Sequence, residues 1–372
     1  MTDLQAQHRA LEPEISRAVA ETLASQELIL GPRVAKFERE LAAFLRAPDV
    51  VGVSSGTDAL LLALTDAGVG TNDEVITSAF TFVATAEVIA RVGARPVFVD
   101  VHADSLCIDV EAVRRAITPK TRALIAVHLF GHPADVAALR SLCDDRGLVL
   151  IEDCAQSFGA RLGERALGTF GHYAAFSFFP SKILGGAGDG GAVLTDTERA
   201  ARIRSLRNHG SVDRETFERV GGNFRLDALQ AAILSVKLRH AESFLSARAT
   251  AVASYRRAFG EARLRTPELE GAVLLPPERE GTPAWNYFVV RARDRDALGE
   301  SLRRAGVGSS AYYRRPLHLQ PCFASLGMRE GDRPHTEAAS RDVLALPLYP
   351  ELSASQIDEV VRAVEQHHRG ER

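Results

Sequence analysis

The stretch Phe176-Ser-Phe-Phe-Pro-Ser-Lys182-Ile-Leu-Gly-Gly-Ala-Gly-Asp-Gly-Gly191 places one lysine between an apolar run and a loop that contains five glycines. Glycines allow the backbone to approach a neighbouring group closely. Partial burial of the amine would disfavour the ammonium and leave the neutral nucleophile that a Schiff-base lysine needs. The alternative from this window alone is a solvated lysine beside a glycine turn.

The other lysines of the chain lie in ordinary sequence contexts. Lys36 is on a charged helical face, Lys120 is in a Pro-Lys-Thr turn, and Lys237 is on a predicted amphipathic helix. Lys182 is therefore the lysine to which a chemical role is most readily assigned.

Length and composition indicate a globular protein of two domains. A chain of 372 residues exceeds what one hydrophobic core usually supports. We predict a large domain at 1–240, with an N-terminal helical segment, and a small C-terminal domain at 241–372. The hydrophobic content of 46% and charged content of 25% are those of soluble proteins. The net charge of −3 gives no electrostatic reason to expect nucleic acid or an anionic membrane as a partner.

The cysteines and the N-terminus indicate a cytoplasmic protein. The four cysteines, at 107, 143, 154 and 322, are scattered without a Cys-x-x-Cys pair, so we expect buried thiols and no metal site. Residues 1–9 are polar where a signal peptide needs an apolar core. No apolar run is long enough to span a bilayer.

Strands and helices alternate through the first domain. Two helices are predicted within 12–46, broken at Gly31-Pro32. Strands are predicted at 50–53, 74–77, 96–100, 122–127, 149–153 and 192–195, and further helices after 58 and at 82–92, 110–117, 134–146 and 198–207. This alternation predicts an α/β fold with a mostly parallel sheet flanked by helices. Ligands of such sheets bind at the carboxyl ends of the strands.

The C-terminal part has a different pattern. A long amphipathic helix opens at 221–227 and is predicted to link the two domains. A strand is predicted at 285–291 and helices at 295–305 and 354–366, which indicates a smaller α+β domain. The polar, aromatic loop at 311–318 has an ordinary surface turn as its alternative.

Two further motifs lie at predicted strand ends, where His128 also falls. Ser55-Gly-Thr57 follows the strand at 50–53, and such a turn either binds a phosphate or caps the next helix. Asp153 follows an apolar run at 149–151 and needs a cationic partner or several donors, unless it is an N-cap. A phosphate cradle, a buried carboxylate and a lysine are together what pyridoxal phosphate (PLP) requires.

The sequence resembles the DegT/DnrJ/EryC1/StrS family of sugar aminotransferases, which are PLP enzymes of fold type I. The matching stretches cover nearly the whole chain. They are Ser55-Gly-Thr-Asp-Ala-Leu60, Phe80-Thr-Phe-Val-Ala-Thr85, Glu152-Asp-Cys-Ala-Gln-Ser-Phe-Gly159, Ser177-Phe-Phe-Pro-Ser-Lys182, Gly188-Asp-Gly-Gly191, Arg207-Asn-His-Gly210 and Asn223-Phe-Arg-Leu-Asp-Ala-Leu-Gln-Ala-Ala-Ile-Leu234.

The resemblance implies a role for each matching residue. Lys182 would form the Schiff base and Asp153 would contact the pyridine nitrogen of PLP. The other implied contacts are Gln156 near the ring hydroxyl, Phe82 on the ring face, and Gly56, Thr57 and Ser177 at the phosphate. Asn223 would reach the phosphate of a neighbouring subunit, which implies a homodimer with shared active sites. Arg225, Tyr313 and His318 would contact the nucleotide sugar.

The resemblance leaves the reaction and the substrate open in part. Transfer of an amino group from L-glutamate to a nucleotide-linked keto-sugar is the leading hypothesis, and the glycine-loop motifs are similar to those of relatives that act on 3-keto hexoses. A sugar dehydratase of the same pattern would carry histidine in place of Lys182. The motifs also leave room for a keto-cyclitol aminotransferase and for a non-catalytic regulatory protein on the same fold. Ile183 and the run Tyr312-Tyr-Arg-Arg315 depart from the family pattern.

Overall fold

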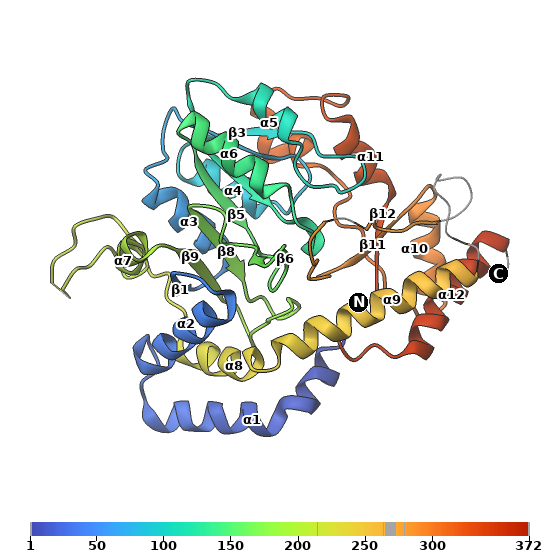
Figure 1. The fold of residues 1–372 in the computed structure, drawn as a ribbon, viewed down its shortest axis with the longest axis horizontal. Helices are drawn as coiled ribbons and strands as arrows, with labels where there is room; N and C mark the ends of the chain where they lie inside the picture. The colour runs from blue at the N-terminus through green and yellow to red at the C-terminus, as the bar shows by residue number, and fades with distance from the viewer. Residues whose placement is uncertain (1, 214, 263, 265–272, 279, 371–372) are drawn as a thin grey trace.

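A seven-stranded sheet forms the centre of this computed structural model of the chain (Figure 1). The structure describes residues 2–213, 215–262, 264, 273–278 and 280–370. The strands are β1 (Asp49–Val53), β2 (Glu74–Ser78), β3 (Arg95–Val99), β4 (Thr121–Val127), β5 (Val149–Asp153), β8 (Tyr173–Ser177) and β9 (Gly191–Thr195), in the order β1-β9-β8-β5-β4-β2-β3. β9 is antiparallel to both of its neighbours, and the remaining pairs are parallel. The expected mostly parallel α/β sheet is confirmed.

Helices cover both faces of this sheet. They are α2 (Gly31–Leu45), α3 (Gly56–Asp66), α4 (Ala84–Arg91), α5 (Val110–Ala116), α6 (Val136–Arg146) and α7 (Thr197–Leu206). Apolar residues of α2, α5 and α6 share a buried cluster with Leu150 on one face. Residues of α3, α4 and α7 share another with Ile151 on the opposite face. Because side chains alternate along a strand, Glu152 and Asp153 at the end of β5 point to opposite faces.

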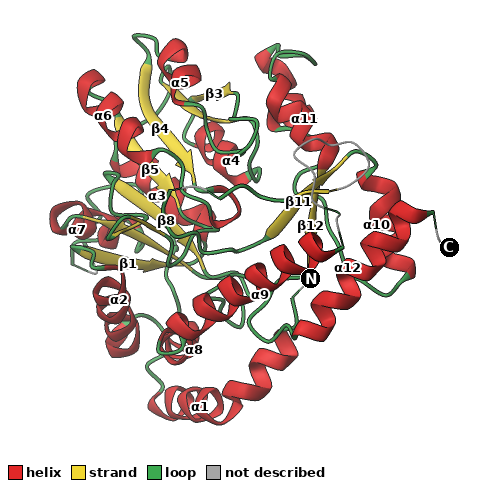
Figure 2. Ribbon diagram, turned by 45° about the vertical axis from the view of Figure 1, so that its right-hand side comes forward, coloured by secondary structure: helices red, strands yellow, loops and turns green. Residues whose placement is uncertain are grey.

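The C-terminal part is built around a three-stranded antiparallel sheet in the order β10-β11-β12. Its elements are α9 (Ala241–Glu261), β10 (Val273–Leu274), β11 (Phe288–Ala292), α10 (Arg295–Arg304), α11 (Pro334–Asp342), β12 (Val343–Leu346) and α12 (Ala354–Arg369). The preceding helix, α8 (Ala228–Leu238), packs with the core cluster of the large sheet. Tyr255, Phe288 and Val360 belong to a separate core cluster beneath the three-stranded sheet. Figure 2 shows α9 extending from α8 towards this sheet. The predicted boundary at 240/241 falls between α8 and α9 and stays a prediction.

The remaining elements are a long N-terminal helix and several short segments. They are α1 (Leu4–Ser25), β6 (Arg161–Leu162), β7 (Arg165–Ala166), and the 3-10 turns η1 (Leu129–Gly131), η2 (Leu317–Leu319) and η3 (Pro321–Leu326). α1 packs on α8 through a small cluster that includes Leu11 and Ile233. No helix in the described part of the chain is both long and apolar enough to cross a membrane.

Three expectations were wrong in detail. Cys322 is exposed, whereas the other three cysteines are buried as predicted. The strand predicted from residue 285 begins at Phe288, because the backbone of Trp285 is left-handed, with φ of 52°. Lys237, which we expected in an ordinary helical position, is 8% exposed.

Candidate active site

A cavity of about 580 Å³ lies at the carboxyl ends of the parallel strands and brings most of the predicted site residues together. Those that line it are Gly56, Thr57, Phe82, Asp153, Gln156, Ser177, Lys182 and Tyr313. They come from separate segments of the chain. The parallel strand arrangement explains this convergence, because β5 and β8 end side by side, with Asp153 opposite Ala175.

The turn between β1 and α3 forms one end of the cavity. Ser55 is the N-cap of α3, and its hydroxyl accepts a hydrogen bond from the Asp58 N–H at 3.0 Å. A Cβ atom at Gly56 would lie 2.7 Å from the Ser177 Cβ, so this position requires glycine. The capping interpretation of the turn is confirmed, and phosphate binding stays a prediction. Ser55 caps the helix, while Gly56 and Thr57 present the first turn, with its positive end of the helix dipole, to the cavity.

Asp153 lies on the cavity wall and is 5% exposed. Its carboxylate accepts hydrogen bonds from the Thr85 hydroxyl at 2.8 Å and from the Ala155 N–H at 3.1 Å. Burial raises the pKa of Asp153, and the two hydrogen bonds and the charge of Lys182 lower it only in part. A buried carboxylate whose hydrogen-bond donors are both neutral suits a cationic group of a ligand.

Lys182 lies on the loop between β8 and β9 and faces the same cavity. Burial lowers the pKa of its amine from the ordinary value of 10.5 to about 8, and the attraction of Asp153 partly opposes this shift. A larger fraction of the amine is therefore neutral near pH 8 than in an exposed lysine. This is the state that a nucleophilic or basic lysine needs.

Gln156 is held at both ends of its side-chain amide. Its Oε1 accepts a hydrogen bond from the Phe130 N–H at 2.8 Å, and its Nε2 donates to the Tyr313 hydroxyl at 3.0 Å. Tyr313, from the loop before η2, is thereby fixed to the segment that follows Asp153. Because the Tyr313 oxygen accepts this bond, its own proton remains available to donate into the cavity.

Aromatic rings form another wall of the cavity. Phe82 is 54% exposed, and its ring centroid lies 6.2 Å from that of Tyr313. Tyr287 and Tyr312 also line the cavity, with ring centroids 4.6 Å apart. Such walls suit a planar ring.

Three predicted residues lie outside this wall. Asn223 is exposed and pairs with Asn208 in an isolated β-bridge. Arg225 donates to the Asn208 side chain at 2.9 Å. His318 is 2% exposed and lies 3.0 Å from Glu337, to which its Nε2 is hydrogen-bonded. Within one chain, none of the three lines the cavity.

His128, at the end of β4, belongs to a structural network. Its Nδ1 accepts from the Ala134 N–H at 3.1 Å, so its Nε2 is the ring nitrogen that donates to Glu152, at 3.0 Å. Glu152 also accepts from the backbone N–H groups of Gly168, Phe170 and Gly171. The ligand atoms of His128, Glu152 and Cys154 lie within 4.8 Å of one another. Both histidine nitrogens are engaged, so this cluster fixes a loop and is not arranged to bind a metal.

Sequence reasoning missed several residues that line the cavity, among them Thr81, Thr85, Tyr287, Ser181 and Asp189. Thr85 belongs to the stretch 80–85 that resembles the family. It lies in the first turn of α4, which follows a strand, and this position could have predicted that it faces a ligand. Tyr287 carries no local signal, because it reaches the cavity only through the packing of the C-terminal part.

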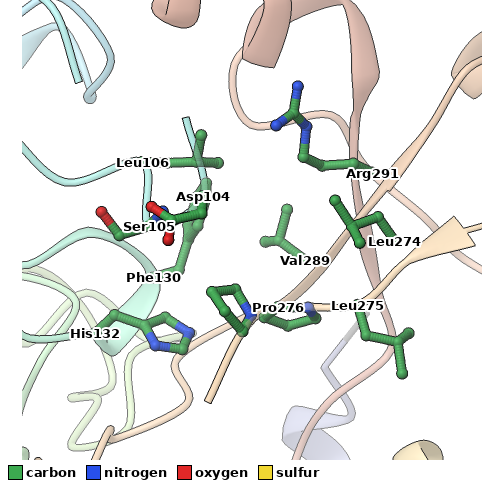
Figure 3. Close-up of a pocket in the computed structure, with 11 residues that line it drawn as sticks. Asp104, Ser105, Leu106, Phe130, His132, Leu274, Leu275, Pro276, Val289 and Arg291 are labelled. Carbon is green, nitrogen blue, oxygen red and sulfur yellow. The ribbon is translucent and has the colours of Figure 1, made fainter. Parts of the chain in front are cut away.

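A second cavity, of about 260 Å³, lies between the two parts of the chain (Figure 3). Leu106, Phe130 and His132 line it from one side, and Leu274 and Val289 line it from the other. The Phe130 ring also contacts Tyr287, with centroids 6.2 Å apart. This cavity contains none of the predicted site residues.

The site therefore combines a glycine-dependent anion turn, a buried carboxylate and a lysine of low pKa. These residues fit PLP, since the turn suits its phosphate and Asp153 suits its ring nitrogen. Together with the sheet, they define the class of PLP-dependent enzymes of fold type I.

Comparison with known proteins identifies the family. A model of the DegT/DnrJ/EryC1/StrS aminotransferase family matches residues 9–365. The chain belongs to this family and is a PLP-dependent aminotransferase.

Relatives of known name are similar over their whole length. The chain is 43% identical to the pleiotropic regulatory protein of Geobacillus stearothermophilus, covering 99% of this chain and 98% of the relative. It is 42% identical to the dTDP-3-amino-3,4,6-trideoxy-alpha-D-glucose transaminase of Streptomyces venezuelae, covering 97% of this chain and 94% of that protein.

Solved structures share the fold. The crystal structure of S. venezuelae DesV in complex with a ketimine intermediate is similar with a TM-score of 0.94 and 42% identity, covering 99% of this chain and 97% of that one. A Bacillus subtilis structure, NtdA with bound cofactor PMP, has a TM-score of 0.88 and 30% identity, covering 97% and 82%.

The burial of the Lys182 amine predicts the pH at which it loses its proton and becomes reactive. With the cofactor removed, the neutral amine should become reactive as the pH rises through about 8, whereas exposed lysines in model peptides titrate near about 10.4. Labelling with acetic anhydride over a pH series, followed by peptide mass spectrometry, measures this midpoint, with exposed Lys36 as the internal reference. A midpoint for Lys182 near that of model peptides would show that its amine is not buried.

Proposed function

We propose that this chain transfers an amino group from L-glutamate to a nucleotide-linked 3-keto hexose. The observation that carries the proposal is the meeting of Lys182, Asp153 and the first turn of α3 in one cavity of an aminotransferase. The similarity to a transaminase of a dTDP-3-amino sugar supports the substrate class. L-Glutamate as donor rests on the family resemblance.

The residues of the cavity suggest how the cofactor is held. We propose that the N–H groups of Gly56 and Thr57 and the Ser177 hydroxyl bind its phosphate. Asp153 would keep the proton on the ring nitrogen, with Thr85 holding the carboxylate in place. We propose that Phe82 packs on the ring face. The Gln156–Tyr313 pair would face the ring hydroxyl, with the Tyr313 proton as the donor.

PLP, when bound, supplies an electron sink for the α-carbon of the amino donor. Lys182 is the proposed point of covalent attachment and the proposed base. Its Nζ would take the proton from the α-carbon of glutamate and later give a proton to the former keto carbon of the sugar. A pKa of about 8 suits both directions, because acid–base groups work best near the operating pH.

The outer part of the cavity suits a ring that carries hydroxyl groups. Thr81, Ser181, Asp189 and Tyr312 place hydroxyls and a carboxylate along its wall. The preference for a 3-keto hexose rests on the similarity of the loops at 177–182 and 188–191 to those of 3-keto relatives. These loops are closely packed, since a Cβ at Gly191 would lie 2.4 Å from the Ser55 backbone. Their shape would orient the sugar, and a displacement of about 1 Å costs about 100-fold in rate.

The charges of the cavity support an active site shared between two chains. Among the described residues that line it, Lys182 is the single lysine or arginine. A nucleotide diphosphate and the carboxylates of glutamate need further cations. The segment at 208–213 and 215–223 projects beside α7 (Figure 1) and exposes Val212, Phe217 and Val220, the last at 95%. We propose that this arm packs on a second copy, bringing Asn223 to the cofactor phosphate and Arg225 to the substrate.

Three competing functions differ in what they need from the site. A dehydratase of this family pattern would carry histidine in place of Lys182. A regulatory role, as in the name of the Geobacillus relative, would not require a lysine of lowered pKa beside a buried aspartate. A keto-cyclitol substrate fits the same cavity chemistry, and only turnover separates it from a nucleotide sugar.

Asp153 should act through its charge. Asp153→Asn keeps the shape and the hydrogen bond from Thr85, but it removes the anion that would hold the proton on the ring nitrogen. We expect a loss of about 10²–10³-fold in kcat, typical of one well-placed electrostatic group. Steady-state kinetics with saturating cofactor measures this loss. A near-normal rate would reduce Asp153 to a structural role.

Two inactive variants should complement one another if the sites are shared. Lys182→Ala removes the base, and Asn223→Asp places a negative charge against the phosphate in the other chain. After subunit exchange, one site of each heterodimer would be intact, so about one quarter of wild-type activity is expected from random pairing. If exchange is demonstrated by mass spectrometry and activity stays at zero, the site is built within one chain.

The substrate class is tested by direct comparison of keto compounds. We expect turnover of a 3-keto nucleotide hexose with L-glutamate, and NMR of the product should show the new amine at C3. The matched comparisons are a 4-keto nucleotide hexose, a keto-cyclitol, and L-glutamine as donor. Amination only at C4, or only of the cyclitol, contradicts the proposed substrate. Turnover of any of these ketones by Lys182→Ala at the wild-type rate would contradict the proposed chemistry itself.

A further inference from the structure

Lys237 on α8 is a buried lysine that touches the loop of Lys182. Its Nζ donates hydrogen bonds to the Gly185 carbonyl at 2.7 Å and to the Gln7 Oε1 of α1 at 2.9 Å. Gly185 is three residues beyond Lys182 in the glycine loop. Figures 1 and 2 both show α8 between α1 and the central sheet.

The surroundings of Lys237 are costly for an ammonium group. Both of its hydrogen-bond acceptors are neutral oxygens. Burial lowers the pKa of Lys237, and the attraction of Glu351 opposes this only in part. An apolar side chain at this position would not lose hydration on burial. The presence of a lysine is therefore best explained by the hydrogen bonds that its ammonium group donates. One of these bonds reaches the loop of Lys182.

Gln230 holds the same loop from the same helix. It precedes Lys237 by seven residues, which is about two turns, so both side chains lie on one face of α8. Its Oε1 accepts a hydrogen bond from the Ala187 N–H at 2.8 Å. A Cβ at Gly186 would lie 2.7 Å from this oxygen, which shows how closely the loop approaches α8.

The loop is also closed upon itself on the other side of Lys182. The Lys182 N–H donates to the Phe179 carbonyl at 2.8 Å, and the Gly186 N–H donates to the Phe178 carbonyl at 2.7 Å. A Cβ at Gly185 would lie 2.3 Å from the Pro180 carbonyl oxygen. Lys182 therefore lies within a closed turn that α8 holds at Gly185 and Ala187.

We propose that Lys237 is a positioning residue, whose bond to the Gly185 carbonyl fixes the loop of Lys182 and keeps water from the Lys182 amine. The proposal rests on the proposed role of Lys182. It adds that the geometry of this lysine depends on the bond between α8 and the Gly185 carbonyl.

The test is acetic anhydride labelling of Lys182 in the full-length protein after removal of the cofactor. In Lys237→Met the loop loses one of its two attachments to α8, so water reaches the Lys182 amine and its labelling midpoint should rise by about one pH unit. Gln230→Leu should move the midpoint in the same direction. Lys237→Arg keeps a donor and should stay closer to wild type than Lys237→Met does.

Two controls separate positioning from general stability. Lys120→Met removes an exposed lysine in the turn before β4, at the opposite end of the strands from the cavity, and should leave the midpoint of Lys182 at its wild-type value. Gln7→Leu removes the α1 contact but leaves the bond to Gly185, so it should also leave the midpoint near wild type. If Lys237→Met does not fold, Gln230→Leu and Lys237→Arg still test the attachment of the loop.

The outcomes are distinct. An unchanged midpoint in both Lys237→Met and Gln230→Leu overturns the positioning role. An equal shift in Gln7→Leu would show that Lys237 acts by docking α1, which also overturns it. These results do not depend on catalysis, whereas full transamination by Lys182→Ala would overturn the proposed function and leave the labelling result standing.

Discussion

The structure depends on the burial of two opposite charges at the carboxyl ends of the strands. Asp153 and Lys182 face one cavity, where desolvation raises the pKa of the acid and lowers that of the amine. Each group would be more stable in water, so the surrounding fold must hold them. Thr85 holds the carboxylate from α4, and a closed glycine turn holds the lysine. Both hydrogen-bond donors of Asp153 are neutral, so a protonated ring nitrogen of the cofactor would be a favourable cationic partner for its carboxylate.

Close backbone packing allows this arrangement. The glycines at 56 and 191 bring the anion turn of α3 against β8 and β9 at distances that a Cβ atom would prevent. On the opposite face of β5, Glu152 binds three backbone N–H groups and His128, and so fixes the loop that leads into β8. The two adjacent carboxylates of β5 therefore have different roles, because the alternation of side chains along a strand directs Asp153 to the cavity and Glu152 to the core.

The sequence predicted the parts that depend on local pattern. The alternating strands, the turn at Ser55-Gly-Thr57, Asp153 and Lys182 were found because each lies in a short motif, and the family resemblance added Phe82, Gln156 and Tyr313, which line the same cavity. Contacts between distant segments were missed. Tyr287 reaches the cavity through the packing of β11, Lys237 is buried by α1, and His318 is hydrogen-bonded to Glu337 instead of lining the cavity. Such contacts depend on tertiary packing, which one sequence does not encode in any local window.

The most direct measurement is to locate the covalent bond between cofactor and protein. Borohydride reduction of the holoenzyme fixes the cofactor to the lysine that carries it, and peptide mass spectrometry then identifies that lysine. The chain has four lysines, at positions 36, 120, 182 and 237, so the modified peptide identifies the attachment site unambiguously. The account predicts attachment at Lys182 alone. Attachment at another lysine, or no attachment in a protein that binds the cofactor, would contradict it.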